Sequence, residues 1–312
     1  MKASARLDCL MLFLALVPGL VLQAQDMGTQ DILSLSGRYG LPSEYKEIQG
    51  VEATETGMVN ALTAGFKLAP GILFAINVNH FYFHVKDGLP EPPVIASPIN
   101  LNGIILRTGI IQQVGEAGKL QWLIAPRLMS DFSNLDGNSL QWGGVVSYEK
   151  ASSEYFSWGV GGIYNQELFG PYFVPLFLLK WQASDKWYIE GMLPVTAKVH
   201  YRVSEGLDVG FNHFGLITSY YLGHEDYAGD YIERQSIDLS LFARQRLFGN
   251  IYIEGMAGRT FGRSYKQYSG DEKVDFAIPL VAFGDERTAK NATFKDGMIF
   301  TLKLVFNLKV PE

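Results

Sequence analysis

The chain has a single cysteine, Cys9, among 312 residues, and only 19% of its residues are charged. One cysteine excludes a disulfide scaffold and a zinc–cysteine module. The net charge of −6 argues against non-specific nucleic-acid binding, so we expect no nucleic-acid partner. Beyond the N-terminus, no run reaches the roughly 18 apolar residues that a membrane-spanning helix needs. The chain is instead rich in apolar residues, with 47% hydrophobic and 13% aromatic, which is high for a soluble protein.

The N-terminus has the pattern of a secretory signal peptide. Two basic residues precede the apolar run Leu10–Leu22, and the small residue Ala24 follows it. We therefore expect a signal peptide over residues 1–24 and one mature domain over residues 25–312. Cys9 precedes the apolar run, which is the wrong place for a lipoprotein anchor.

Most of the remaining sequence alternates between apolar and polar residues, as half-buried strands do. One example has Ile72, Phe74, Ile76 and Val78 on one face and Ala75, Asn77 and Asn79 on the other. We count about 14 such segments, each near the 9–11 residues that a tilted strand needs to cross a bilayer.

The connectors alternate between short and long. The short ones fit three-residue hairpin loops: Ala69-Pro70-Gly71, Glu116-Ala117-Gly118, Ala151-Ser152-Ser153, Ala183-Ser184-Asp185, Ser204-Glu205-Gly206 and Phe248-Gly249-Asn250. The long ones are Pro42 to Thr56, Lys86 to Asn100, Phe132 to Asn138, Gly223 to Arg234 and Arg263 to Thr293. Tight turns at one rim and long loops at the other are typical of a bacterial outer-membrane barrel.

These turns predict how neighbouring strands align. The predicted opposite pairs are Arg202 with Asp208, Arg244 with Glu254, and Trp181 with Trp187. All five tryptophans fall on the apolar face, where lipid-facing barrels carry aromatic girdles. The even strand count also requires Pro194 to lie at a turn.

The last strand carries a candidate assembly signal. Lys295-Asp296-Gly297 followed by Phe300 and Leu302 resembles the motif that the barrel-assembly machinery recognises in the outer membrane. The chain departs from the usual form because it continues to Val310-Pro311-Glu312. We expect that machinery to be a partner during biogenesis.

A family resemblance lies in the central third of the chain. The stretches Phe173–Trp181, Asp185–Pro194 and Lys198–Tyr201 resemble a family of uncharacterised Gram-negative outer-membrane β-barrels. The resemblance implies the barrel fold and its location. It supplies no catalytic or binding residues, since that family is classed as a domain of unknown function.

The predicted inward face carries more basic than acidic side chains. It contains Lys67, Arg107, Arg127, Lys180, Lys198, Arg202, Arg244, Arg246 and Lys303 against Glu149, Glu190, Asp208, Asp238 and Glu254. One interpretation is a lumen stiffened by salt bridges, with Asp208, Glu254 and Glu190 as the acidic partners. The other is a positively lined pore that favours anions.

Arg107 and Arg127 are the leading candidates for an anion site. A turn at Glu116-Ala117-Gly118 places them directly opposite each other. Like charges at that distance cost free energy unless a carboxylate or a bound anion lies nearby.

The link Arg263 to Thr293 contains an apolar patch around Phe276–Phe283. It predicts either an external hairpin that extends the wall or a loop that folds into the mouth and narrows it.

Enzymatic and metal sites find little support in the sequence. His80 and His84, with Ser130 or Ser219 as partners, have no spacing that singles them out. Interface side chains reaching towards head groups explain the two histidines more simply. The acidic run after His224 is better explained as a solvated loop than as a cation site. We therefore expect no catalytic residues, metal or cofactor.

We conclude that the fold is all-β, a transmembrane antiparallel up-and-down barrel of about 14 strands, with 12 as the alternative. We expect it in the outer membrane of a Gram-negative bacterium, in contact with outer-membrane lipid. The expected function is a passive or weakly selective channel for small polar or anionic solutes. The alternatives are a closed structural or attachment barrel acting through its loops and, more remotely, a lipid-modifying enzyme.

Overall fold

The computed structural model describes residues 29–89 and 95–309. The predicted signal peptide and the last three residues lie outside this range. Within the described ranges, no helix is long and apolar enough to cross a membrane. Two single-turn 3₁₀ helices, Gly137–Ser139 and Glu225–Tyr227, lie in connecting segments.

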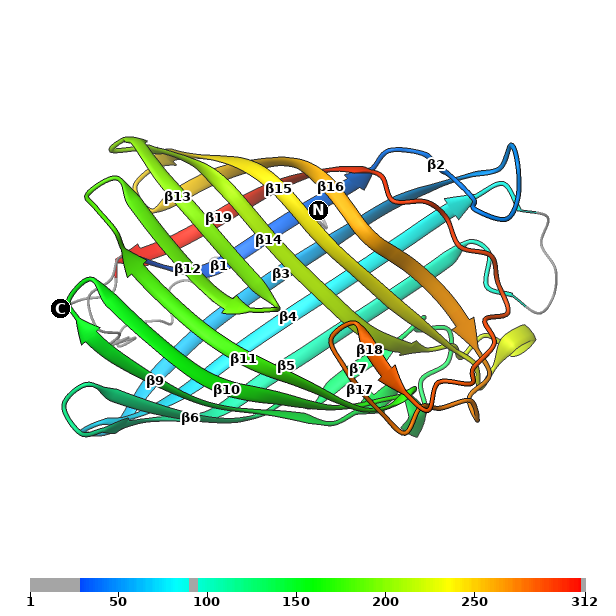
Figure 1. Cartoon of the computed structure of the whole chain (residues 1–312), viewed down its shortest axis with the longest axis horizontal. Helices are drawn as coiled ribbons and strands as arrows, with labels where there is room; N and C mark the ends of the chain where they lie inside the picture. Colours follow the sequence, from blue (N-terminus) through cyan, green and yellow to red (C-terminus); the bar gives the residue numbers. More distant parts are fainter. Residues whose placement is uncertain (1–28, 90–94, 310–312) are drawn as a thin grey trace, which may run out of the picture.

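The described chain forms a closed barrel whose wall has 14 strands, two of them interrupted (Figure 1). In chain order these are β1 (Thr29–Gly40), β3 (Glu52–Ala69), β4 (Ile72–Asp87), β5 (Ile99–Val114), β6 with β7 (Gly118–Ile124, Arg127–Ser130), β8 with β9 (Leu140–Gln141, Gly143–Ser153), β10 (Phe156–Glu167), β11 (Gly170–Gln182), β12 (Trp187–Leu193), β13 (Thr196–Ser204), β14 (Leu207–Tyr221), β15 (Tyr231–Phe248), β16 (Ile251–Tyr268) and β19 (Met298–Lys309). Three short strands lie outside the wall: β2 (Ser43–Glu44), β17 (Phe276–Ile278) and β18 (Val281–Phe283).

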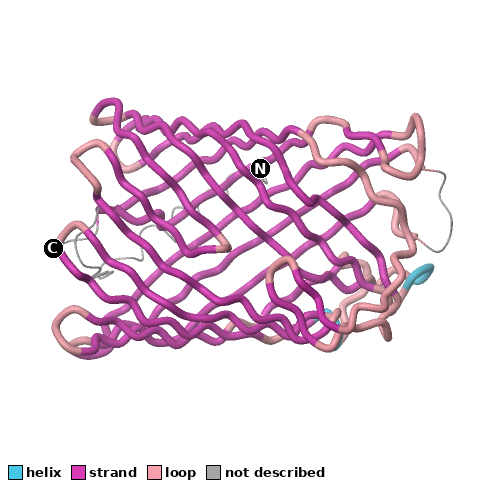
Figure 2. Tube along the Cα trace, in the orientation of Figure 1, coloured by secondary structure: helices cyan, strands magenta, loops and turns pink. Residues whose placement is uncertain are grey.

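Successive wall strands pair antiparallel, and β19 returns to pair with β1, which closes the ring (Figure 2). Ser36 on β1 lies opposite Lys303 on β19, for example. Closure satisfies the backbone groups that an open sheet edge would expose to lipid. The prediction of an up-and-down barrel of 14 strands is therefore confirmed.

Six tight turns lie at one rim, at or close to the six predicted positions. We call this the short-turn rim and the opposite one the long-loop rim; in outer-membrane barrels these are periplasmic and extracellular. One prediction is displaced along the chain, because β9 continues to Ser153 and the turn lies at Glu154 and Tyr155. Pro194 lies at a turn between β12 and β13, as the strand count requires.

The register confirms the two charged pairs and corrects the aromatic one. Arg202 is opposite Asp208 and Arg244 is opposite Glu254. Trp181 lies opposite Ile189 and not Trp187. The reason is that the turn after β11 takes four residues, 183–186, and not three.

The outer face of the wall is apolar. All five tryptophans are among its exposed large side chains, as predicted. On β15, Leu241 is 69% exposed whereas the next residue, Phe242, is 4% exposed and points inward. This alternation is the pattern of strands with lipid on one side and a filled interior on the other.

The long-loop rim is less regular than predicted. Only Leu168 and Phe169 separate β10 from β11, and only Pro194 and Val195 separate β12 from β13. The β12–β13 hairpin is also short, so β11 and β14 both extend beyond its turn (Figure 1).

The predicted loop from Arg263 to Thr293 is wrong in its first part, because β16 continues to Tyr268. The rest contains the β17–β18 hairpin, in which Ala277 pairs in parallel with Tyr172 on β11. The hairpin therefore lies against the wall beyond the β12–β13 turn, with Phe276 and Phe283 stacked at 4.4 Å and partly exposed.

If the outward face contacts lipid, a charged substitution should lower the free energy of unfolding more in the middle of the wall than near a rim. Leu241→Arg near the middle of β15 should lower the free energy of unfolding by about 2–4 kcal/mol, and Leu247→Arg near the short-turn rim by about 0–1 kcal/mol. Urea unfolding of vesicle-inserted protein measures both values. Equal costs at the two positions would contradict a membrane-spanning wall.

Candidate functional site

The long-loop end of β14 leaves the wall and crosses the lumen. Tyr221 forms a parallel bridge with Ser130 on β7, and the amide of Asp131 donates to the Tyr221 carbonyl at 3.0 Å. Between β7 and β14 along the wall lie β8 with β9, β10, β11, β12 and β13. These two segments therefore belong to opposite sides of the ring and meet inside it.

The crossing segment, Thr218–Leu222, is buried on both faces; we call it the septum. Tyr220 and Ser219, whose side chains point to opposite faces of a strand, are both 0% exposed. A wall strand would expose one of the two to lipid. The septum instead divides the long-loop half of the lumen into two packed regions.

On one face of the septum, Tyr220 packs into an apolar cluster lined by β4, β5, β7 and β16. Its ring lies against Gly103 on β5, where an added Cβ would lie 3.3 Å from the ring and 2.8 Å from Met129. A larger residue at this position would require Met129 and Tyr220 to shift. Phe83, Leu101 and other fully buried side chains fill the rest of this region.

The other face is held by Glu167 at the end of β10. Its Oε2 accepts from the amide and the hydroxyl of Ser219, at 2.8 and 2.7 Å. The Ser219 hydroxyl in turn accepts from the amide of Leu168 at 2.7 Å, and Gln141 donates to the Ser219 carbonyl at 3.0 Å. Glu167 also forms a buried salt bridge with Arg127. The septum is thus tied to three wall strands by buried polar contacts.

Asp131, just after β7, holds the chain beyond the septum. Its carboxylate accepts from the amides of Gly223 and His224, at 3.0 and 3.2 Å. The connection that leads to β15 is therefore fixed against the far wall.

The predicted facing pair of Arg107 and Arg127 is wrong. Arg127 lies opposite Ile105, because the chain interrupts its strand at Ala125 and Pro126 between β6 and β7. Arg127 is neutralised by Glu167, while Arg107 donates to Asn77 at 3.1 Å. The two arginines therefore have separate partners, and their role in anion binding stays a prediction.

A buried cluster of charges lies inside the barrel, along the part of the wall that runs from β15 through β16, β19 and β1 to β3. The carboxylate of Glu55 lies 2.7, 3.8 and 3.9 Å from the guanidinium groups of Arg38, Arg234 and Arg263. Arg38 also pairs with Asp238 at 2.9 Å. These side chains come from β1, β3, β15 and β16, and all are nearly inaccessible to water.

Aromatic rings complete this cluster. The Arg234 guanidinium lies 3.7 Å from the centre of the Phe83 ring on β4 and donates through Nε to the Tyr265 hydroxyl at 3.0 Å. Cation–π contact and hydrogen bonding stabilise a charge that has left water. Of the charges in this cluster, only Asp238 is among the residues predicted from the sequence to face inward.

The short-turn half of the lumen is polar and reached by water. Glu254 is buried among Lys198 at 2.8 Å, Lys303 at 3.5 Å and Arg244 at 3.7 Å. Other inward side chains are accessible: Lys180, 3.3 Å from Glu149, has 43% of its side chain exposed. We call this space the chamber.

The remaining predicted residues lie in or near the chamber. Glu190 contacts His200 at 3.4 Å and is cross-strand neighbour to both Lys180 and Lys198. Arg202 and Asp208 are 3.4 Å apart close to the rim, with the Arg202 side chain 59% exposed. Arg246 lies exposed at the short-turn end of β15, near the same rim.

The candidate catalytic residues have other contacts. A ring nitrogen of His80 contacts Asn60 at 3.2 Å, and one of His84 contacts Asn100 at 2.7 Å. Ser130 and Ser219 belong to the septum contact and are fully buried.

Glu55 provides a test of the buried cluster. Glu55→Gln should lower the free energy of unfolding by about 3–5 kcal/mol, because it leaves three buried arginines with Asp238 as the nearby carboxylate. Asp208→Asn, which breaks an exposed pair, should cost about 0–1 kcal/mol. Urea unfolding in vesicles measures both, and a similar small effect of the two variants would contradict the cluster.

Comparison with known proteins gives a family and several similar folds. The chain is similar to the COG4313 outer membrane channel from Pseudomonas putida F1, at 11% identity, with 94% of this chain and 100% of that chain covered and a TM-score of 0.44. It is similar to the Pseudomonas putida toluene transporter TodX at 11% identity, with 94% and 93% covered and a TM-score of 0.36. It is also similar to the translocator domain of the autotransporter NalP from Neisseria meningitidis, at 11% identity, with 97% of this chain and 96% of that chain covered and a TM-score of 0.34.

These scores are low, and the barrel assignment rests on the strand pairing of this chain itself. No curated protein matched the chain. A family described as a domain of unknown function, DUF6268, matches residues 119–276, which is just over half of the chain. The match runs from β6 to β17 and includes the septum as well as the stretches that carried the family resemblance. The chain therefore belongs to the DUF6268 family.

Proposed function

We propose that this protein is a gated outer-membrane channel for small polar solutes, with the septum as its gate. The observation that carries the proposal is the division of one lumen into a charged, water-accessible chamber and a packed region closed by the buried end of β14, which stays paired with β15. A barrel that served only as a rigid support would not need an accessible charged interior. The outward apolar belt supports the location in the outer membrane.

The wall itself provides a reason why the septum can move. β13 pairs with β14 only from Leu207 to Phe214, and Val195 at the hairpin turn accepts from the Gly215 amide at 2.8 Å. Beyond Gly215, this edge of β14 has no neighbouring wall strand. The septum keeps its antiparallel pairing with β15, and its other edge is held by side-chain contacts and one backbone bridge to β7. An outward swing of the β14 and β15 ends together would break only the contacts on that other edge.

The charges of the chamber support anions as the preferred solutes. Basic side chains outnumber acidic ones there: Arg107, Lys119, Lys180, Lys198, Arg244 and Lys303 stand against Asp31, Glu149, Glu190 and Glu254. An excess of one sign of charge in a narrow space raises the local concentration of the opposite ion.

A closed structural barrel is the second candidate. It is favoured by the complete burial of Tyr220 and Ser219, which is what a permanent plug would show. The two functions differ in whether the septum opens, which a cross-link can decide.

A disulfide across the septum should silence the channel. In the variant Ser130→Cys/Tyr221→Cys, the two substituted positions are direct partners in the bridge between β7 and β14. In planar bilayers we expect conductance bursts from the reduced protein and none after oxidation, because the septum can no longer leave the lumen. Tyr220→Ala should raise the open time, since it removes the ring that contacts the opposite wall.

The matched control places the same cross-link within the wall. Leu239→Cys/Arg259→Cys joins neighbouring positions of β15 and β16 and should leave conductance unchanged on oxidation. Conductance that survives the septum disulfide would show that solutes take another path. Silence of every variant, Tyr220→Ala included, would favour the closed structural barrel.

Ion selectivity tests the solute preference separately. In a salt gradient, the reversal potential should indicate anion preference, and Lys180→Glu should shift it towards cations because the side chain lies in the accessible chamber. Lys86→Glu, on the outward face of β4 at the long-loop rim, should have no such effect. An unchanged reversal potential in Lys180→Glu would rule out the chamber as the selectivity region.

A further inference from the structure

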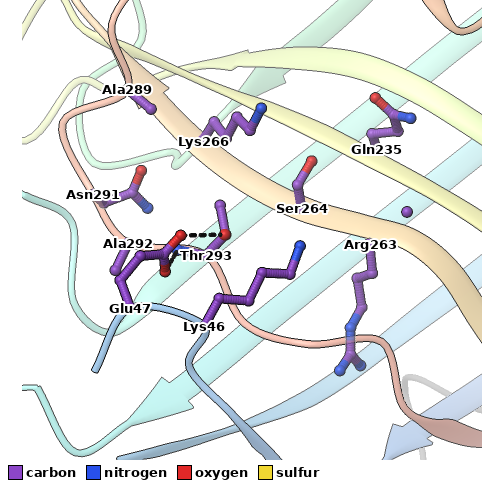
Figure 3. A pocket seen from close by; sticks show the side chains of 11 residues that line it. Lys46, Glu47, Gln235, Arg263, Ser264, Lys266, Ala289, Asn291, Ala292 and Thr293 are labelled. Carbon is purple, nitrogen blue, oxygen red and sulfur yellow. Dashed lines mark hydrogen bonds between the residues drawn. The ribbon is translucent and has the colours of Figure 1, made fainter. Parts of the chain in front are cut away.

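A second cavity lies outside the lumen, at the long-loop end of β15 and β16 (Figure 3). It has a volume of about 630 Å³ and is bounded by these two strands, by Lys46 and Glu47, and by residues 289–293. Gln235, Ser264 and Lys266 line it with outward-facing side chains. Arg263 of the buried cluster also lines the cavity, and the neighbouring inward side chains, Arg234 and Tyr265, belong to the same cluster.

A bulge in the wall forms the floor of this cavity. The register of β15 and β16 shifts between Gln235 and Ile237, next to Gly262, whose φ is +61°. The extra residue reverses the alternation, so that Phe261 faces outward below the bulge whereas Ser264 and Lys266 face outward above it. Bulges of this kind re-aim side chains and are frequent beside binding sites.

The cavity lies where the apolar belt ends. Along β15 the outward residues change from Leu241, Leu239 and Ile237 to Gln235 and Glu233. On β16, the exposed Phe261 is the last apolar outward residue before Ser264, and the outward Arg259 lies two residues below it. In a membrane-spanning barrel this change marks the level of the lipid head groups, so the cavity opens beside the outer leaflet.

Two ammonium groups point into the cavity, from Lys46 and Lys266 (Figure 3). Among the described residues, neither has a carboxylate within ion-pair distance. The cross-strand neighbour of Lys266 is Glu233, but Arg287 binds that carboxylate at 2.8 Å. Glu47 is the carboxylate of the cavity, and it accepts from the amide and hydroxyl of Thr293, both at 3.0 Å.

The remaining polar groups suit a tetrahedral anion. The Ser264 hydroxyl lies between the two lysines, and the Gln235 amide lies opposite Ser264 on β15 (Figure 3). Both provide neutral hydrogen-bond donors. Asn291 is already engaged, because it donates to the Tyr265 carbonyl and accepts from the Gln267 amide, both at 2.8 Å. Two cations with added hydroxyl and amide donors form the usual setting for a phosphate.

We propose that this cavity binds the phosphate group of a lipid head group in the outer leaflet. Lys46 and Lys266 neutralise the phosphate, Ser264 and Gln235 donate hydrogen bonds to it, and the acyl chains lie along the apolar outer face of β15 and β16. The site is separate from the lumen and does not depend on whether the septum opens; it rests only on the location in the membrane. It would hold one lipid at a fixed position beside the buried arginine cluster.

The test uses the full mature chain and native mass spectrometry, with dioleoyl phosphatidic acid as the probe lipid. Lys46→Gln/Lys266→Gln should weaken binding of the probe about 30-fold, since each lysine near a membrane surface contributes about 1 kcal/mol. Lys86→Gln is the matched control, because it removes an exposed outward lysine at the same rim on β4, and it should bind as the unaltered protein does. Circular dichroism verifies that all variants retain their strands.

Two further probes decide the source of the phosphate. Dioleoyl phosphatidylcholine should bind weakly, because its phosphate is a diester that carries a choline cation. Millimolar inorganic phosphate should not displace phosphatidic acid. Displacement by inorganic phosphate would identify a site for the free ion and overturn the lipid assignment. Unchanged binding in Lys46→Gln/Lys266→Gln, or an equal loss in Lys86→Gln, would overturn the site itself.

Discussion

The interior of this barrel depends on one constraint, which is the unpaired edge of β14 beyond the short β12–β13 hairpin. A strand edge in a membrane cannot remain exposed to lipid, because each unpaired amide or carbonyl there costs several kcal/mol. From Gly215 onward, β14 has β15 on one side and no wall strand on the other. Bending into the lumen gives this edge new partners on β7 and β10. The β17–β18 hairpin covers part of the opening that is left in the wall, against β11.

The two halves of the lumen differ because of this bend. In the long-loop half, opposite walls come into contact, and apolar side chains pack as in the core of a soluble protein. The Arg38, Glu55, Arg234 and Arg263 cluster lies within that half, where pairing and aromatic contact replace the lost hydration. In the short-turn half the walls stay apart and the charges remain accessible. This difference between the two halves is the basis of the proposed gate.

The sequence predicted those features that follow from local periodicity. Alternation and turn residues predicted the barrel, its strand number, six tight turns and the Arg202–Asp208 and Arg244–Glu254 alignments. They did not predict the septum, because its cause lies in the length of a neighbouring hairpin. The local signal is a loss of alternation from Leu216 to Leu222, where apolar and polar residues come in adjacent runs. Arg263 was assigned to a loop, since the bulge at Gly262 reverses the alternation of β16 beyond it. Arg234 was assigned to the end of the preceding loop, whereas β15 already begins at Tyr231. The expected opposition of Arg107 and Arg127 failed for a similar reason, an interruption at Ala125 and Pro126.

The central claim is that the chamber opens to the short-turn rim and is closed by the septum towards the long-loop rim. Side-specific labelling of Lys180→Cys tests it most directly, because this position is inward and accessible, and the only native cysteine, Cys9, lies in the predicted signal peptide. A charged, membrane-impermeant thiol reagent is added to one side of oriented, protein-containing bilayers. We predict rapid modification from the short-turn side and much slower modification from the long-loop side. Equal rates from both sides would contradict a septum that closes the lumen.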